Sequence, residues 1–319
     1  SQDPIIVDWF SAPVIPIDDF AFELVEFSGR WTKELQMNHA QWLPGARVRD
    51  NPTGRSGHEH FPAVFVINQD SNNNSGKAYG LHYGWSGGHK MIAEELPDGR
   101  RQIQMGHASG SYGEADVTFK TAPLYMAFGG DGLNSVSTQF QRFVSGQLKN
   151  KPASRKPRPI HFNCWEAVYF EHSLERLKNL AQTAAELGAE RFVLDDGWFG
   201  KRNSDRTSLG DWNVNCEKYP IGLSPLIDHI KNLGLEFGLW FEPEMVNPKS
   251  DLFINHPDWI LGLPNQNLGR NQLVLDLSKS EVIDYLYNCI NEILLQYDVD
   301  YVKWDHNRVL PIVEAKQTY

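Results

Sequence analysis

The sequence predicts a multidomain protein with a β-rich first half and an α/β second half built on a parallel sheet. Three observations lead to this prediction. In the first half, turn residues separate short segments rich in β-branched and aromatic residues at intervals of about ten residues. Near residue 160 the pattern changes to strands that alternate with amphipathic helices. The acidic side chains of the second half then cluster where its strands end.

Length and composition limit the possible functions. The 319 residues suffice for two ordinary domains, and 41% of them are hydrophobic. No apolar run reaches the roughly 20 residues that span a bilayer, so we expect no membrane partner. The net charge of -10 repels phosphate backbones, so we expect no nucleic-acid partner either. Three widely spaced cysteines, Cys164, Cys216 and Cys289, fit neither a disulfide framework nor a zinc site and favour a reducing compartment.

Residues 1–150 form the predicted β domain, and a basic, proline-containing linker runs from there to about residue 159. Strands are expected at 21–29, 63–69, 78–85, 100–107, 116–121 and 123–130, which is typical of a sandwich. The polar segment 70–76 is expected at a hairpin tip, and 137–148 is either a helix or a last strand. His58 and His60 are expected on one strand face, but no further ligand cluster lies nearby in the sequence, so we expect no metal site.

Residues 160–319 form the predicted α/β domain. Strands are expected at 159–167, 191–198, 235–244 and 299–305, and helices at 173–188, 224–234 and 278–297. The helix at 173–188 carries an apolar stripe from Leu174 to Leu187 and is closed by Gly188. Helical crossovers imply a parallel sheet. The sheet is either a (β/α)8 barrel or a doubly wound open sheet, although no GxGxxG or Walker loop follows the first strand.

Polar and aromatic residues mark the carboxyl ends of all four expected strands. They are Trp165, Glu166, Asp195, Asp196, Trp240, Glu242, Glu244 and Asp305. In a (β/α)8 barrel this edge carries the active site. Carboxylates accept hydrogen bonds from vicinal hydroxyls, and an indole face covers the apolar face of a sugar ring. The edge therefore predicts a site for a neutral sugar, with no cofactor and no metal.

The stretch YVKWDHNR, at 301–308, holds the strongest candidate for chemistry. Because side chains alternate along a strand, Lys303 and Asp305 project to one face. The alternative is a solvated Lys and Asp pair at a strand end. Cleaving a glycosidic bond requires two carboxyl groups, and a lysine beside the nucleophile would help to keep it ionised. Lys303 is expected to do this for Asp305.

Seven motifs give the chain a specific resemblance. They are NCWEA (163–167), LDDGWFG (194–200), SLGDW (208–212), GLWFEPEMVNP (238–248), HPDW (256–259), RNQLVLDLS (270–278) and KWDHNR (303–308). In this order and spacing the chain resembles the α-galactosidases of glycoside hydrolase family 36, from about Phe22 to its last residue. The resemblance implies part of an N-terminal β-supersandwich followed by the first half of a (β/α)8 TIM-type barrel, about four βα units.

The resemblance also implies roles for single residues. Asp305 is the expected nucleophile, and Asp195 and Asp196 are expected to bind sugar hydroxyls, with loop or helix capping as the alternative. Trp198 is expected either to line the site or to pack in the core. Glu242 and Glu244 are expected to support the rim, which is the edge of the sheet formed by the carboxyl ends of the strands. The other expected binding residues are Trp165 and Trp240 as pocket walls, Arg270 and Lys303 as cations, and Asn307.

Two departures concern specificity, and a third concerns length. Cys164 stands where a small polar residue is expected, and Val309 where an acidic one is. The expected acid/base, an aspartate downstream of KWD, has no counterpart before Tyr319, and half a barrel would leave strand edges unpaired. We therefore expect a piece of a larger retaining exo-α-galactosidase, cytoplasmic and homotetrameric, that acts on melibiose and raffinose-type sugars.

Three alternatives stay open at this point. The parent could act on α-N-acetylgalactosaminides, or it could transfer galactose to build raffinose sugars. By itself the chain could also be a non-catalytic sugar-binding or structural piece, because half of the catalytic pair lies outside it.

Overall fold

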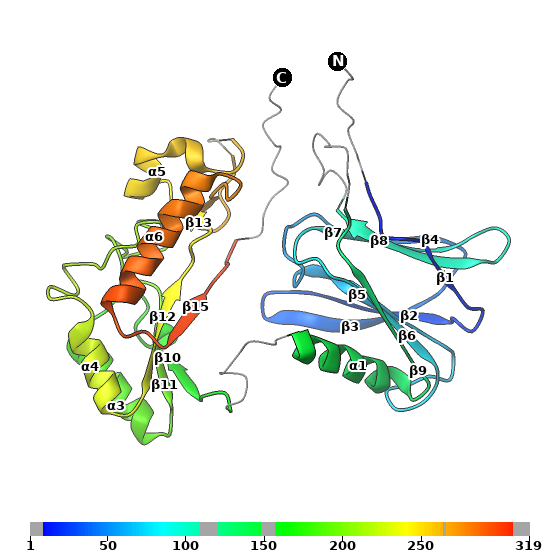
Figure 1. Ribbon diagram of the computed structural model, residues 1–319, viewed down its shortest axis with the longest axis horizontal. Helices are drawn as coiled ribbons and strands as arrows, with labels where there is room; N and C mark the ends of the chain where they lie inside the picture. The colour runs from blue at the N-terminus through cyan, green and yellow to red at the C-terminus, as the bar shows by residue number, and fades with distance from the viewer. Residues whose placement is uncertain (1–8, 109–119, 148–156, 264–265, 309–319) are drawn as a thin grey trace, which may run out of the picture. The chain divides into compact units, whose positions relative to one another are not determined.

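The structure is a computed structural model that describes residues 9–108, 120–147, 157–263 and 266–308. The chain forms two compact units, one built mainly of Ser1–Arg155 and the other mainly of Lys156–Arg308 (Figure 1). The predicted linker and the expected strand at 116–121 fall mostly outside the described residues and stay predictions. Within the described ranges, every helix is too short or too polar to cross a membrane.

The first unit is a β-sandwich, as predicted. Its four-stranded sheet has the order β1-β8-β7-β4, and its five-stranded sheet the order β3-β2-β5-β6-β9. The first sheet comprises β1 (Ile15–Ile17), β8 (Arg101–His107), β7 (His89–Glu95) and β4 (Gly45–Asn51). The second comprises β3 (Lys33–Gln41), β2 (Glu23–Arg30), β5 (Glu59–Ile67), β6 (Ala78–Tyr83) and β9 (Leu124–Gly129). Leu24, Val64, Leu81 and Ile103 belong to the core cluster that both sheets share.

The segment for which helix and strand were both open is a helix, α1 (Gly132–Gln147). Val136 and Phe140, one helical turn apart, pack with Val25 on the outer face of the five-stranded sheet (Figure 1). The segment 70–76 connects β5 and β6 as the predicted hairpin tip, and its Asn72 carbonyl accepts the N–H of Leu133 at 3.1 Å. The hairpin tip thus satisfies one of the donors that a helix start leaves unpaired.

Several strands of this unit escaped prediction. Strand β3 is polar and exposed on both faces, so it lacks the alternation that identifies a half-buried strand.

The expectation that His58 and His60 share one strand face was wrong. β5 begins only at Glu59, whose backbone is in the left-handed region (φ 59°), so the regular alternation does not extend back to His58.

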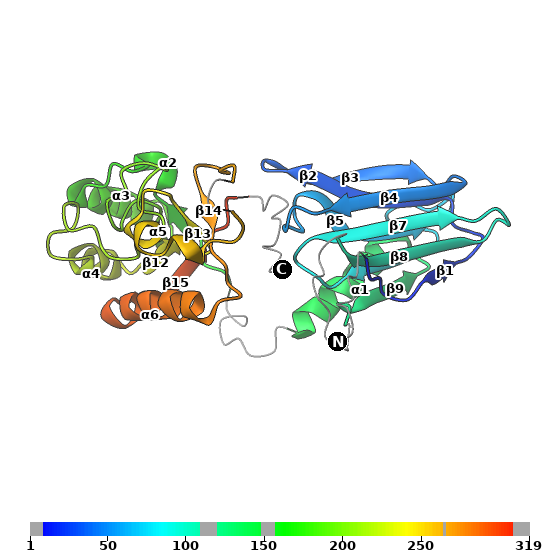
Figure 2. The ribbon, with the colours of Figure 1, turned by 90° about the horizontal axis from the view of Figure 1, so that it is seen from above.

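The second unit contains a parallel sheet whose strands follow in chain order. Its strands are β10 (His161–Asn163), β11 (Arg191–Leu194), β12 (Glu236–Phe241) and β15 (Tyr301–Trp304). A doubly wound sheet reverses its strand order at a switch point, whereas a barrel does not. The order β10-β11-β12-β15 therefore fits consecutive strands of a barrel. The crossovers hold α3 (Leu174–Glu186), α4 (Ser224–Asn232) and α6 (Ser280–Gln296), which lie along the outside of the sheet (Figures 1 and 2).

Some details of this unit differ from prediction. Leu187, placed on the apolar stripe of α3, is 84% exposed, whereas Gly188 does close the helix with a φ of 88°. The first strand ends at Asn163, because the side chain of Asn163 accepts the N–H of Trp165 at 2.8 Å and turns the chain. Trp165 and Glu166 therefore lie in a short helix rather than on the strand. Short elements that were not expected are α2 (Trp165–Val168), β13 (Met245–Val246), α5 (Asp251–Asn255), a 3-10 helix (Pro257–Trp259) and β14 (Leu273–Val274).

Candidate active site

Strand register places the candidate residues on one face of the parallel sheet. Asn163 is paired with Val193, Val193 with Gly238, and Trp240 with Lys303. Because side chains alternate along each strand, one face collects the polar residues and the other faces the helices. The polar face comprises Asn163, Asp195, Trp240, Glu242, Lys303 and Asp305. The opposite face carries the buried apolar residues Phe192, Leu194, Phe237, Leu239 and Phe241.

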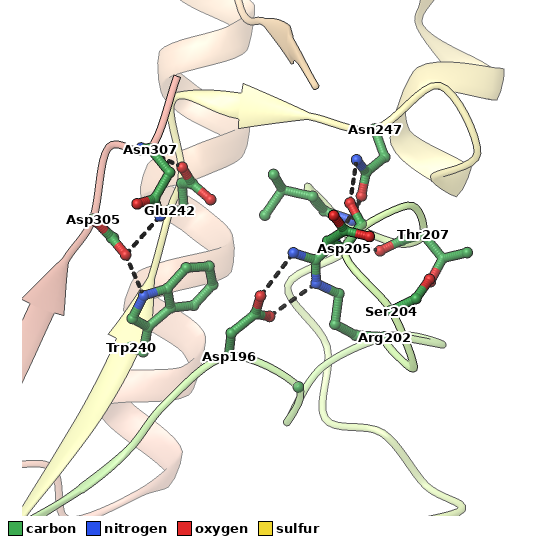
Figure 3. A network of polar contacts seen from close by, with 12 residues as sticks. Asp196, Arg202, Ser204, Asp205, Thr207, Trp240, Glu242, Asn247, Asp305 and Asn307 are labelled. Carbon is green, nitrogen blue, oxygen red and sulfur yellow. Dashed lines mark hydrogen bonds and ion pairs between the residues drawn. The ribbon is translucent and has the colours of Figure 1, made fainter. Parts of the chain in front are cut away.

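Asp305 directly follows β15 and is held by three donors. Its Oδ2 accepts the indole N–H of Trp240 at 2.9 Å and the side-chain amide of Asn307 at 2.7 Å (Figure 3). Its Oδ1 accepts the backbone N–H of His306 at 2.9 Å. These bonds fix the orientation of the carboxylate. Asp305 is only partly buried, so it retains access to solvent.

Lys303 binds Asp195 rather than Asp305. Its Nζ lies 2.7 Å from Asp195 Oδ2, which also accepts the side-chain amide of Asn163 at 2.5 Å. Burial lowers the pKa of Lys303, but the hydrogen bond and charge of Asp195, together with the charge of Asp305, outweigh it and raise the pKa overall. Lys303 therefore stays charged, and its effect on Asp305 acts through space. We expected Lys303 to place a positive charge beside Asp305, and its direct hydrogen bond to Asp195 was not predicted.

Asp196 forms a buried ion pair with a residue that sequence reasoning missed. Arg202 donates to both carboxylate oxygens, at 2.8 Å and 2.7 Å, and its side chain is 2% exposed. Burial raises the pKa of Asp196, and the bonds from Arg202 oppose that shift. Both carboxylate oxygens of Asp196 accept hydrogen bonds from Arg202. Asp196 is therefore engaged in the ion pair, whether or not it also binds a ligand.

Glu242 follows β12 and is 1% exposed. Its Oε1 accepts the backbone N–H of Asn307 at 2.6 Å, and its Oε2 accepts the side-chain amide of Gln272 at 3.1 Å. Burial raises the pKa of Glu242 to about 6. Both oxygens are engaged, so Glu242 supports the turn that carries Asn307, in agreement with the rim role we predicted for it. Glu244 accepts the indole N–H of Trp304 at 2.9 Å.

The three tryptophan candidates and Arg270 lie in different surroundings. Trp198 is fully buried and donates its indole N–H to the Trp240 carbonyl at 2.9 Å, which favours core packing over site lining. Trp240 is 2% exposed, and its N–H holds Asp305. Trp165 is half-buried and meets Tyr169 and Phe170 edge-on. Arg270 is exposed, and within the described ranges no side-chain contact joins it to the other candidates.

Lys218 is another functional candidate that the sequence did not suggest. Its Nζ donates to the carbonyls of Phe170, Gly197 and Arg202 at 2.8–2.9 Å. It therefore joins two loops, the one between α2 and α3 and the one between β11 and α4. Burial lowers its pKa to about 8. Asn163 could have been found, because it ends a strand on the polar face. Lys218 and Arg202 lie in an irregular loop where no periodicity marks them.

A separate cavity of about 310 Å³ lies between the loop 212–222 and α6. None of the predicted site residues lines it, so we do not assign the chemistry to it.

In the part of the chain that the structure describes, no group of three or more His, Cys, Asp or Glu residues is arranged to hold a metal ion. The cysteines Cys164, Cys216 and Cys289 are unpaired.

The geometry describes a fixed carboxylate, Asp305, beside a charged Lys303–Asp195 pair at one edge of a parallel sheet. A family model described as melibiase matches residues 118–319, and one described as the glycosyl hydrolase family 36 N-terminal domain matches residues 1–112. The chain belongs to glycosyl hydrolase family 36. This membership confirms the resemblance, and with it the β-rich domain followed by part of a TIM-type barrel.

Relatives within family 36 are similar along nearly the whole chain. An α-galactosidase of Escherichia coli is 45% identical over 94% of this chain and 43% of its own length. The α-galactosidase AgaA of Geobacillus stearothermophilus is 38% identical over 90% of this chain and 40% of its own length. This chain therefore spans less than half the length of these family 36 relatives.

Solved family 36 structures share the fold. The crystal structure of α-galactosidase AgaB from Geobacillus stearothermophilus superposes with a TM-score of 0.90 at 35% identity, over 96% of this chain and 43% of that one. A variant of AgaA in complex with raffinose gives the same TM-score, identity and coverage. Another variant of AgaA was solved in complex with stachyose.

Proposed function

We propose that the whole protein is a retaining exo-α-galactosidase that removes terminal α-galactosyl residues from raffinose-type oligosaccharides and melibiose. The observation that carries this proposal is the Asp305 carboxylate, fixed by Trp240 and Asn307 on the polar face of the barrel sheet. A nucleophile must present an oxygen to the anomeric carbon in a defined orientation. Relatives named α-galactosidases, and AgaA structures with raffinose and stachyose, support the substrate class.

In the proposed reaction Asp305 attacks the anomeric carbon, and the leaving oxygen takes a proton from a general acid. A galactosyl ester forms, and water attacks it with the same group as general base, so the α configuration is kept. Asp195, Asp196, Arg270 and Lys303 are the proposed binders of sugar hydroxyls, and Trp165 and Trp240 are the proposed walls of the pocket. No cofactor or metal takes part.

Glu242 is a poor candidate for the general acid, although its pKa is raised to about 6. It is 1% exposed, and both oxygens accept bonds from Asn307 and Gln272. A general acid must reach the leaving oxygen. The family resemblance implies an aspartate further downstream as the acid/base, and we therefore propose that this role lies outside residues 1–319. It follows that the isolated chain should bind sugar without multiple turnover.

The experiment uses the whole protein with p-nitrophenyl α-galactoside and its 2-acetamido analogue. We expect hydrolysis of the galactoside only, α-galactose as the first product by NMR, and a loss of kcat of at least about 10⁴-fold for Asp305→Asn. Preference for the acetamido substrate would favour an α-N-acetylgalactosaminidase, and transfer to sucrose in excess over hydrolysis would favour a galactosyltransferase. Undiminished activity of Asp305→Asn would refute the proposed mechanism.

The assembly and the location are also proposals. By family resemblance we propose a homotetramer in the cytoplasm. Sedimentation equilibrium of the whole protein tests the first, and fractionation of the source cells tests the second.

A further inference from the structure

We infer that Asn247 is a positioning residue that holds the turn carrying Arg270 and joins it to the Asp196–Arg202 ion pair. This inference rests on the proposed function, because Arg270 and Asp196 are proposed there to bind the galactosyl group. Asn247 follows β13 and is fully buried. Figure 3 shows it beside Arg202 and Asp205, apart from the nucleophile.

The side chain of Asn247 makes four hydrogen bonds to two segments, the loop 202–209 and the turn that contains Asn271. Its Oδ1 accepts from Arg202 Nη1 at 2.9 Å and from the N–H of Leu209 at 3.0 Å. Its Nδ2 donates to the carbonyl of Asn271 at 2.7 Å and to that of Asp205 at 3.2 Å. A buried primary amide with both groups engaged in this way has few alternative orientations. Asn247 therefore fixes these segments relative to one another.

The turn that Asn247 holds is strained. The N–H of Gln272 donates to the Gly269 carbonyl at 2.9 Å, and the two central residues, Arg270 and Asn271, have φ of 51° and 60°. Primed turns of this kind favour Gly, Asn or Asp, and an arginine there is unfavourable. Such a conformation persists only when its surroundings hold it, and it is typical of functional sites.

Further contacts hold the same turn. The side-chain amide of Asn271 donates to Asp205 Oδ2 at 3.2 Å, and Gln272 donates to Glu242 Oε2. A Cβ built on Gly269 would lie 2.9 Å from Arg308 Cγ, so the turn is seated closely against that side chain. Of the side chains that hold the turn, Asn247 alone also contacts Arg202, which holds Asp196 at both oxygens. The positions of Arg270 and Asp196 are thus linked through one amide.

The variant Asn247→Asp tests the bonds to Asn271 and Asp205 separately from those to Arg202 and Leu209. The new carboxylate still accepts hydrogen bonds from Arg202 and Leu209. Toward the carbonyls of Asn271 and Asp205, however, it presents an oxygen in place of the amide donor. We expect KM for p-nitrophenyl α-galactoside to rise about tenfold, equivalent to about 1.4 kcal/mol, with kcat within about threefold of wild type. In an Arg270→Ala background the same change should add less than about twofold to KM, because the residue that it positions is gone.

Trypsin cleavage after Arg270 gives a readout that does not depend on activity. In the whole protein we expect Asn247→Asp to speed this cleavage about tenfold, because the turn opens more often. Asp205→Ala, an exposed position, removes only the acceptor for Asn271 and should speed it less; it also serves if Asn247→Asp does not fold. Lys201→Ala, exposed on the same loop, is the matched control and should leave both KM and cleavage unchanged.

Each outcome decides a different claim. Additive effects of Asn247→Asp and Arg270→Ala on KM, or unchanged cleavage after Arg270, would overturn the positioning role while leaving the proposed function intact. A normal KM for Arg270→Ala would instead remove Arg270 from the proposed binding site. If the wild-type protein does not hydrolyse the galactoside, the proposed function fails, and the trypsin result alone decides whether Asn247 holds the turn.

Discussion

Replacing Arg202 by methionine should destabilise the second unit strongly. The Arg202 side chain is 2% exposed, and it donates to Asp196, to Asn247 and to the Thr207 carbonyl. Methionine keeps much of the aliphatic volume but supplies no donor. The Asp196 carboxylate would then be buried without its ion-pair partner, and Asn247 and the Thr207 carbonyl would each lose a bond.

The size of the effect follows from burial. Breaking a buried ion pair by removing one partner costs about 3–5 kcal/mol, because the remaining charge is uncompensated. Converting Asp196 to asparagine in the same chain removes that charge. We therefore expect the double variant Arg202→Met with Asp196→Asn to recover about 2 kcal/mol relative to Arg202→Met alone.

Urea unfolding of the four members of this cycle, followed by tryptophan fluorescence, measures the coupling energy. Arg30→Met is the matched control, since Arg30 and Glu59 are also 2.7 Å apart but the Arg30 side chain is 75% exposed. We expect this control to unfold like the wild type. The reasoning is refuted if Arg202→Met costs less than about 1 kcal/mol, or if the coupling energy is close to zero.

Three further predictions concern stability. Burial raises the pKa of Glu242 to about 6, so the native state binds a proton at this carboxyl more tightly than the unfolded state does. The free energy of unfolding should therefore fall as pH rises from about 4.5 to 6, and Glu242→Gln should reduce this fall by about 1–2 kcal/mol in urea unfolding. An unchanged pH dependence in the variant would contradict this prediction. Burial lowers the pKa of His89 to about 4, so the free energy of unfolding should fall as pH drops from about 6.5 to 4. In the same urea-unfolding assay, His89→Gln should remove up to about 3 kcal/mol of that loss. A variant whose stability depends on pH as the wild type's does would argue against this prediction. Gly132 has a φ of 74°, and a Cβ there would lie 2.4 Å from the Asn72 carbonyl oxygen, so Gly132→Ala should cost more than about 2 kcal/mol in thermal unfolding. At Gly99, with a φ of 82° and no atom within 4 Å of the Cβ, alanine should cost only about 1 kcal/mol, and equal losses at the two positions would refute the steric argument.

The polar face of the parallel sheet could be predicted from the sequence because two simple rules act together. Side chains alternate along a strand, and the carboxyl ends of parallel strands meet at one edge. These rules placed Asp195, Trp240, Lys303 and Asp305 together, and the register confirms it. They did not give the partner of Lys303, because that choice depends on side-chain geometry between neighbouring strands.

The loop residues could not be predicted in this way. Arg202 and Asn247 are 45 positions apart and meet only because the loops after β11 and β12 fold over the same rim. Neither loop has a period, so no pattern marks the buried polar residues. Strand β3 was missed for a related reason, since it is exposed on both faces and its polar sequence shows no alternation.

The central claim is that Asp305 is the nucleophile, and trapping the galactosyl intermediate tests it most directly. The whole protein would be treated with a mechanism-based galactosyl inhibitor, digested and mapped by mass spectrometry. We predict a single label on the Asp305 carboxylate, in the peptide that contains YVKWDHNR. A label on Asp195, Asp196 or Glu242 would contradict the assignment, and in the last case Glu242 would have to leave its bonds to Asn307 and Gln272.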